Sequence, residues 1–119
     1  MSTVDLTEAT FEATVKDNPI VLVDFWAPWC GPCRQFGPIF EASSERHPGV
    51  VHAKLDTEAV PSVAAAAGIS SIPTLVAFRD GILVFSQAGA LPSAALEQVL
   101  QEVVGLNMDE VRAAVAAQA

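Results

Sequence analysis

Two cysteines, Cys30 and Cys33, lie where an apolar strand pattern gives way to a helical one. The run Ile20–Trp26 is almost entirely apolar and rich in β-branched residues, which is typical of a central strand covered on both faces. From residue 32 to about residue 46 the apolar side chains follow helical spacing. We therefore expect the cysteine pair at a strand-to-helix turn, with the first thiol facing the N-terminus of a helix.

The rest of the chain alternates between strand and helix patterns in the same way. Such alternation predicts an α/β fold with parallel strand pairing, and Arg79-Asp80-Gly81 has the turn chemistry of a hairpin that adds an antiparallel end. The expected strands are residues 4–6, 20–26, 50–55, 74–78 and 82–87. The expected helices are one capped by Thr7 and ended by Asn18, then residues 32–46, 60–67, 93–104 and 108–117. The helix over residues 93–104 carries an apolar stripe of Leu96, Val99, Leu100, Val103 and Val104.

Length and charge narrow the classes of function. A chain of 119 residues that is 51% hydrophobic is expected to form one globular domain. The net charge of −8, without a basic cluster, argues against nucleic acid or a membrane surface as a partner. The first residues lack the features of a signal peptide, and no apolar run approaches the roughly 18 residues of a membrane span. We expect a cytoplasmic protein, in which a close cysteine pair is catalytic or metal-binding more often than structural.

Zinc is the main alternative use of the cysteines, because His47 and His52 follow at spacings that fit a zinc finger. A finger needs both histidines on one face of one helix, but Pro48 and Gly49 lie between them and residues 50–55 have a strand pattern. We therefore expect no metal site. A static disulfide, or two idle core thiols, is the simpler alternative, and it leaves the strand-to-helix position of the pair without a purpose.

A redox pair has a physical mechanism at this position. Backbone N–H groups at the start of the helix stabilise the Cys30 thiolate, which is the reactive form of the thiol. Cys33, one turn further along, is expected to be more buried, to stay protonated, and to attack the mixed disulfide formed by Cys30. Asp24 is also notable, since an acid inside an apolar strand is unfavourable unless it is paired or neutral. The simpler interpretation is a core aspartate bonded to Lys54.

The segment Trp29-Cys30-Gly31-Pro32-Cys33, preceded by Val23-Asp24-Phe25-Trp26 and followed by Ile72-Pro73-Thr74, closely resembles the thioredoxin family. The resemblance covers about residues 4–104. It implies the thioredoxin fold, a central mixed β-sheet flanked by helices on both faces. We expect a thioredoxin domain over residues 1–105 and a C-terminal extension over residues 106–119. Asn107 and Glu110 resemble a capping box, so the extension is expected to contain a short helix and no separate domain.

The resemblance also implies roles for single residues. By position, Cys30 is the nucleophile and Cys33 the resolving thiol, Asp24 is a buried carboxylate that exchanges a proton with Cys33, and Lys54 is the lysine that approaches this carboxylate. Pro73 matches the family's cis-proline, which leaves the neighbouring backbone free to bind an extended substrate chain. Substrate contacts are expected from a set of residues around the pair: Trp29, Gly31, Pro32, Ile72, Pro73, Gly89 and Ala90. For Trp29 alone, simple packing is the alternative.

The implied activity is thiol–disulfide exchange that reduces protein disulfides, so that the protein acts as an electron carrier in cell redox homeostasis. The resemblance implies a monomer with no bound cofactor, recycled by a thioredoxin reductase that draws on NADPH. The chain itself has no glycine motif for a nucleotide. Thr57 and Ser71 place polar side chains beside the expected groove, which leaves partner preference open. The alternative function is a binding module that docks a partner through Trp29 and residues 72–74 in either redox state.

Overall fold

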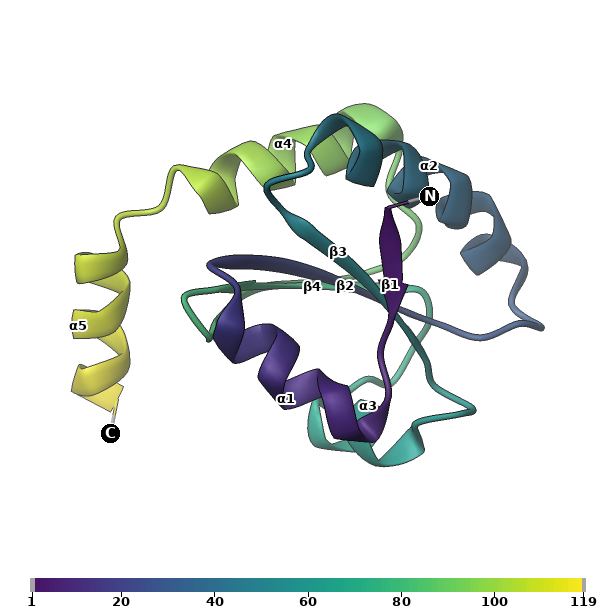
Figure 1. Ribbon diagram of the computed structural model, residues 1–119, viewed down its shortest axis with the longest axis horizontal. Helices are drawn as coiled ribbons and strands as arrows, with labels where there is room; N and C mark the ends of the chain where they lie inside the picture. The colour runs from purple at the N-terminus through teal and green to yellow at the C-terminus, as the bar shows by residue number, and fades with distance from the viewer. Residues whose placement is uncertain (1, 119) are drawn as a thin grey trace.

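The computed structural model describes residues 2–118 and places one mixed sheet between two layers of helices (Figure 1). The first residue of the predicted domain, residue 1, and the last residue of the predicted extension, residue 119, lie outside the described residues. The strands are β1 (Thr3–Asp5), β2 (Ile20–Trp26), β3 (Val51–Asp56), β4 (Thr74–Arg79) and β5 (Ile82–Ala88), in the sheet order β1-β3-β2-β4-β5. The helices are α1 (Glu8–Asp17), α2 (Gly31–Arg46), α3 (Pro61–Ala66), α4 (Ser93–Val104) and α5 (Met108–Gln118). The predicted fold class is confirmed, with β2 in the centre of the sheet.

Strand pairing follows the alternation of the sequence. β3 pairs parallel with β1 and β2, whereas β4 pairs antiparallel with β2 and β5. The hairpin turns at Asp80 and Gly81, whose φ angles of 53° and 79° are both in the left-handed region that glycine and aspartate tolerate best. In this register Asp24 on β2 lies opposite Lys54 on β3 and Leu75 on β4.

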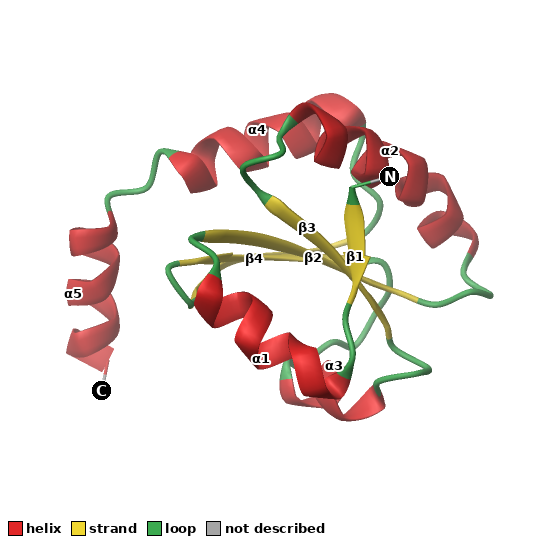
Figure 2. Cartoon of the chain, viewed as in Figure 1, coloured by secondary structure: helices red, strands yellow, loops and turns green. Residues whose placement is uncertain are grey.

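The two faces of β2 belong to different cores. Val21, Val23 and Phe25 pack into the layer that contains α1 and α3, whereas Leu22 packs against α2 and α4. Figure 2 shows these two helical pairs on opposite sides of the sheet. Because side chains alternate along a strand, Asp24 faces the same side as Leu22. The buried acid therefore lies beneath the helix that begins after Cys30.

The helix ends largely follow the predicted signals. The Thr7 side chain accepts a hydrogen bond from the Thr10 N–H at 3.2 Å, and α1 gives way to extended backbone at Asn18. Along α4, Leu96, Val99, Leu100 and Val103 are buried, as predicted. The inclusion of Val104 in this stripe is wrong: it is 46% exposed, because it follows the last packed position and ends the helix.

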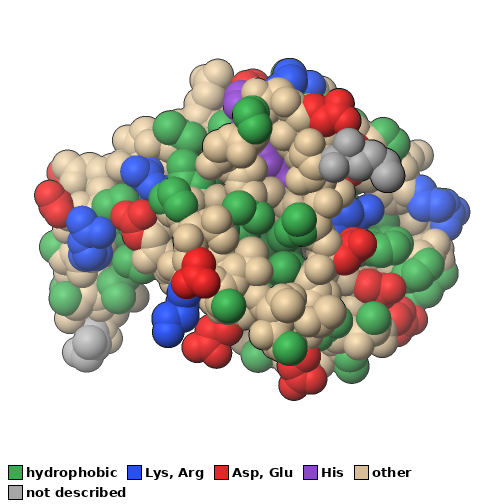
Figure 3. Space-filling model, in the orientation of Figure 1, with side chains coloured by type: hydrophobic (Ala, Val, Ile, Leu, Met, Phe, Trp, Pro, Cys, Tyr) green, Lys and Arg blue, Asp and Glu red, His purple; other side chains and the backbone are tan. Residues whose placement is uncertain are grey.

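The C-terminal extension forms α5, as predicted. The Asn107 side-chain oxygen accepts the N–H groups of Asp109 and Glu110 at 3.0 and 3.2 Å, which caps the helix. The return bond of a full capping box, from the Asn107 N–H to the Glu110 side chain, is absent from the hydrogen bonds of residues 2–118. Met108 is the one buried residue of α5, and a hollow separates the far half of this helix from the body of the molecule (Figure 3). Within residues 2–118, every helix is too short or too polar to span a membrane.

Candidate active site

Cys30 and Cys33 form a disulfide across the first turn of α2, with their Cα atoms 5.2 Å apart. β2 delivers the chain to a short turn, in which the Cys30 N–H donates to the Ala27 carbonyl at 3.2 Å. Cys30 then caps α2, and its sulfur accepts the Cys33 N–H at 3.3 Å. Pro32, in the first turn, has no N–H to leave unsatisfied. The helix N-terminus thus directs a backbone donor at the Cys30 sulfur, as the sequence predicted.

The expected difference in burial between the two cysteines is wrong. Each residue is 4% exposed, and both lie in a small apolar cluster with Ala27, against which Trp26 and Ile72 pack. Cys30 is covered because it caps the helix beneath Ile72 and does not project from it. The two sulfurs differ in their neighbours instead: Cys30 accepts a backbone N–H, whereas Cys33 lines a cavity that also contains Lys54.

Asp24 is fully buried on β2, and neither of its carboxylate oxygens has a hydrogen-bond partner among residues 2–118. Burial raises the pKa of this carboxyl from 3.8 to about 7, while the positive charge of Lys54 acts in the opposite direction. The simpler interpretation, a core aspartate hydrogen-bonded to Lys54, is therefore wrong. The result is an acid that can gain or lose a proton near neutral pH, beneath the helix that carries Cys33.

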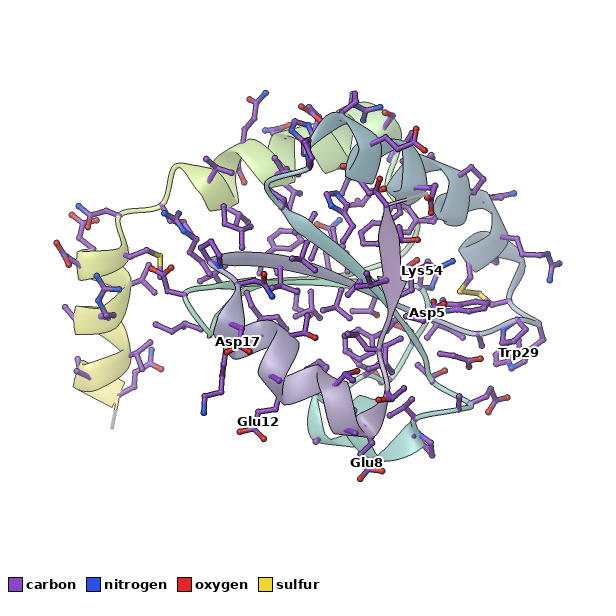
Figure 4. The ribbon with its side chains drawn as sticks, in the orientation of Figure 1. Asp5, Glu8, Glu12, Asp17, Trp29 and Lys54 are labelled. Atoms are coloured by element: carbon purple, nitrogen blue, oxygen red, sulfur yellow. A yellow bond between two sulfur atoms is a disulfide. The ribbon has the colours of Figure 1, made fainter. Side chains whose placement is uncertain are left out.

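Lys54 is the neighbour of Asp24 in the strand register, but its ammonium group is directed at the Trp26 ring. The Lys54 Nζ lies 4.5 Å from the centre of the Trp26 ring, a cation–π contact. Figure 4 shows Lys54 on β3. The Trp26 indole N–H is itself buried, without a hydrogen-bond partner in the part of the chain that the structure describes.

The groove beside the disulfide is formed by the start of β4 and the end of β5. The Cys30 sulfur lies 3.8 Å from the carbonyl oxygen of Ile72, and the Ile72–Pro73 peptide bond is cis. The Gly89 N–H donates to the Pro73 carbonyl at 2.8 Å, and its φ of 100° is a conformation that suits glycine. Ala90, next in the chain, is exposed. Ile72, Pro73 and Gly89 thus lie together, as the resemblance implied.

Trp29 lies at the tip of the loop before α2, 66% exposed (Figure 4), so the packing alternative for this residue is wrong. Its indole N–H donates to the Glu58 carboxylate at 2.7 Å. Trp29 also lines a pocket of about 220 Å³. Thr57 and Ser71, the two polar residues expected beside the groove, line it as well. The remaining lining residues are Ala64, Ile69, Ser70 and Ile72. The Thr57 hydroxyl donates to the Trp26 carbonyl at 3.1 Å, so its proton is turned away from the pocket.

Two carboxylates near the site were not singled out from the sequence. Glu58 holds the Trp29 ring, and Glu41 lines the cavity beside Cys33. Glu58 could have been found by position, since it follows the carboxyl end of β3, next to the carboxyl end of β2 from which the active-site loop starts. The sequence signal for Glu41 is weaker: Glu41 is an acid eight residues beyond Cys33, on the same side of the helix predicted over residues 32–46.

The histidines of the zinc alternative have other partners. The His47 ring bonds the Glu97 carboxylate at 2.8 and 2.9 Å, while the His52 ring contacts the Ser43 hydroxyl at 2.9 Å and the Val50 carbonyl at 3.0 Å. His47 ends α2 and His52 lies on β3, so the broken helix was predicted correctly. In the part of the chain from residue 2 to residue 118, no group of three or more His, Cys, Asp or Glu side chains could hold a metal ion.

Comparison with known proteins gives the same assignment as this geometry. Residues 2–102 match the family model named Thioredoxin. The chain belongs to the thioredoxin family. It is 57% identical over 117 residues to a candidate thioredoxin 2 of Streptomyces coelicolor, covering 98% of this chain and 87% of that one. It is 42% identical over 106 residues to the thioredoxin of Porphyra purpurea, covering 87% and 99%.

A solved structure gives the same result for the fold. A mutant thioredoxin from Halobacterium salinarum superposes with a TM-score of 0.83 at 31% identity, covering 89% of this chain and 94% of that one. Membership of the thioredoxin family, together with the Cys30–Cys33 disulfide, makes this protein a thiol–disulfide oxidoreductase with a redox-active cysteine pair.

Proposed function

We propose that the protein reduces disulfide bonds in other proteins, with Cys30 as the nucleophile and Cys33 as the resolving thiol. The observation that carries this assignment is the position of Cys30 as the cap of α2, where its sulfur accepts the Cys33 N–H at 3.3 Å. In the reduced protein the same donor stabilises a thiolate at Cys30. Cys33 lies inside the first turn and has no such place at the helix end.

The reaction has two exchange steps. The Cys30 thiolate attacks one sulfur of the target disulfide, forming a mixed disulfide and releasing the other target sulfur as a thiolate. Cys33 then loses its proton to Asp24 and attacks the Cys30 sulfur, which forms the Cys30–Cys33 disulfide and releases the second target thiolate. Two electrons pass from the cysteine pair to the target. The buried carboxyl of Asp24, with a pKa of about 7, suits a base that accepts one proton at neutral pH.

The groove provides a place for the target segment. Ile72, Pro73 and Gly89 offer backbone and apolar surface beside the Cys30 sulfur, and Trp29 with Ile72 lines the adjoining pocket. Gly31, Pro32 and Ala90 complete the proposed contact surface, at the start of α2 and after β5. An extended chain is the kind of partner that such an exposed backbone edge can bind.

Electrons reach the pair from another protein. We propose a thioredoxin reductase that draws on NADPH as the donor and disulfide-containing proteins as the acceptors. The protein works in the cytoplasm as a monomer, where reducing conditions keep a close cysteine pair in catalytic use. Family resemblance supports these assignments, and it also favours reduction over oxidation as the direction of use.

Trapping experiments test the two cysteine roles. Cys33→Ser is expected to accumulate covalent partners through Cys30, because the mixed disulfide is no longer resolved, whereas Cys30→Ser traps few. Partners are separated on non-reducing gels, with the double variant Cys30→Ser/Cys33→Ser as the control. Equal trapping by the two single variants contradicts the assigned roles. Unchanged biological activity of the double variant, despite loss of NADPH-linked insulin reduction, supports the binding-module alternative.

A further inference from the structure

One stripe of α2 faces the strands that carry Asp24 and Lys54. Cys33, Gly37 and Glu41 follow one another at intervals of four residues, so they share a side of the helix. Gly37 has no side chain, and a Cβ atom placed there would meet nothing within 4 Å. The space is a cavity of about 330 Å³, lined by Trp26, Cys33, Arg34, Gly37, Pro38, Glu41 and Lys54.

Lys54 enters this cavity beside an acid with which it does not pair. Asp24 is its neighbour in the β2–β3 register, yet neither oxygen of Asp24 has a hydrogen-bond partner within the described residues. The Lys54 ammonium lies instead 4.5 Å from the centre of the Trp26 ring. The contact with the Trp26 ring favours the observed position of the ammonium, and an anion on the same side of the cavity would favour it further.

Glu41 is a carboxylate fixed at the wall of the same cavity. Its Oε1 accepts the Ser2 N–H at 3.0 Å and its Oε2 accepts the Thr3 hydroxyl at 2.7 Å. The hydrogen bond from Thr3 is the main reason that the pKa of Glu41 lies below its usual value, and the charge of Lys54 adds to this effect. Glu41 is therefore an anion at neutral pH, and Ser2 together with Thr3, the first residue of β1, holds it in place.

Arg34, the other charged residue that lines the cavity, does not take part in placing the Lys54 ammonium. The Arg34 guanidinium donates to the Pro28 carbonyl at 3.1 Å, which directs it toward the loop before α2. The strand on the other side of β2 contributes Leu75 opposite Asp24, which carries no charge. His52, which precedes Lys54 on the same face of β3, is bonded to Ser43 and Val50. On the other side of β3, the exposed Asp5 of β1 lies opposite Lys54 in the strand register (Figure 4). Lys54 thus lies between the buried Asp24 and two acids nearer the surface, of which Glu41 lines the cavity wall.

We propose that Glu41 is a positioning residue, which holds the Lys54 ammonium toward the outer side of the cavity and away from Asp24. The inference rests on the proposed function, in which Asp24 takes the proton of Cys33. A lysine paired with Asp24 would make the carboxylate a weaker base. Glu41 keeps Asp24 basic enough for that step at neutral pH by sharing the same cation.

The test is the titration of the Asp24 carboxyl in the oxidised protein, followed by carbon NMR in wild type and in Glu41→Gln. Glutamine keeps the size of the side chain and removes its charge. We expect the Asp24 midpoint to fall by a few tenths to about one pH unit as Lys54 turns to Asp24. Thr3→Val, which removes one of the bonds that hold Glu41, should give a smaller shift in the same direction. Glu12→Gln, on α1 across the sheet (Figure 4), makes the same charge change and should give none.

A double-variant cycle shows whether Glu41 acts through Lys54. In a Lys54→Met background, Glu41→Gln should leave the Asp24 midpoint unchanged. An equal shift with and without Lys54, or no shift in Glu41→Gln itself, overturns the proposal. The pH profile of mixed-disulfide resolution, measured on the same variants, separates this proposal from the proposed function. If the Asp24 titration moves and the rate profile does not follow, Glu41 positions Lys54 as inferred, and the proton role of Asp24 fails.

Discussion

At the scale of single residues, Asp24 shows how a function can oppose stability. The carboxyl lies in the central strand and is fully buried, and residues 2–118 provide no hydrogen-bond partner for either oxygen. Its pKa of about 7 means that the folded protein resists ionisation of this group over several pH units in which the unfolded chain ionises freely. The same shift makes the group useful as a proton acceptor at neutral pH.

Asp24→Asn should make the oxidised protein relatively more stable as the pH rises. The raised pKa of Asp24 means that its favourable contribution is fully present below pH 3.8 and is lost as the pH rises through about 7. Asparagine has no such dependence. Relative to wild type, we expect the free energy of unfolding of the variant to grow by roughly 4 kcal/mol between pH 3.5 and pH 8.

Urea unfolding of both proteins across this pH range measures the effect, and any constant difference between the side chains cancels in the comparison. Asp56→Asn, at the half-buried end of β3, is the matched control and should show no comparable growth with pH. Parallel curves for wild type and Asp24→Asn would show that the Asp24 carboxyl is not held neutral by burial.

The residues of the site were predictable to different degrees. Cys30, Cys33 and Asp24 stand out because their chemistry conflicts with, or interrupts, the local apolar pattern. The equal burial of the two cysteines could not be predicted, because Ile72, which packs against them, lies far along the chain. Glu58 and Glu41 were missed for the same reason: their partners are distant in sequence, Trp29 for Glu58, and Ser2 and Thr3 for Glu41. Contacts of this kind depend on tertiary packing and leave little trace in local spacing.

At the scale of elements, hydrophobic period and turn residues were sufficient for the type and order of every helix and strand described here. The β3 and α3 limits differ from the predicted limits by one residue at each end, which is the usual uncertainty of such boundaries. The pattern did not predict which side-chain hydrogen bonds join one element to another. Arg79 was assigned only to the hairpin turn, yet its guanidinium donates to the carbonyls of Val103 and Val104 at 2.7 and 2.9 Å. These bonds close the C-terminus of α4 against β4.

Arg79→Ala should therefore destabilise the fold by about 1–3 kcal/mol, since it removes charge-assisted hydrogen bonds to the last carbonyls of a helix. Chemical denaturation gives the free energy directly. Arg112→Ala is a matched control, because Arg112 makes ion pairs with Asp80 and Asp109 but is 52% exposed. We expect the control to change stability by less than about 1 kcal/mol. Equal losses in the two variants would show that the contact with α4 contributes no more than a surface ion pair.

At the scale of the whole molecule, the site and the C-terminal extension lie at opposite ends. Trp29 and the disulfide are on one side of the longest dimension, and α5 is on the other (Figure 4). Every residue that we assign to the site lies in β2, β3 or α2, or in the loops next to β2, β4 and β5, and none lies in α5. We propose that residues 1–105 form the thioredoxin domain and that residues 106–119 are an addition to it, without a core of their own.

Removal of residues 106–119 tests this division. Arg79 closes α4 without help from α5, so the shortened chain should still unfold in one cooperative transition. The main loss is the packing of Met108, the one buried residue of α5, and we expect the free energy of unfolding to fall by about 1–3 kcal/mol. Met108→Ala in the full chain should reproduce most of that loss. Reduction of insulin disulfides should proceed at the rate of the full chain, because α5 lies far from the groove. A slower rate in the shortened chain, with its fold intact, would mean that α5 takes part in binding the substrate or the reductase.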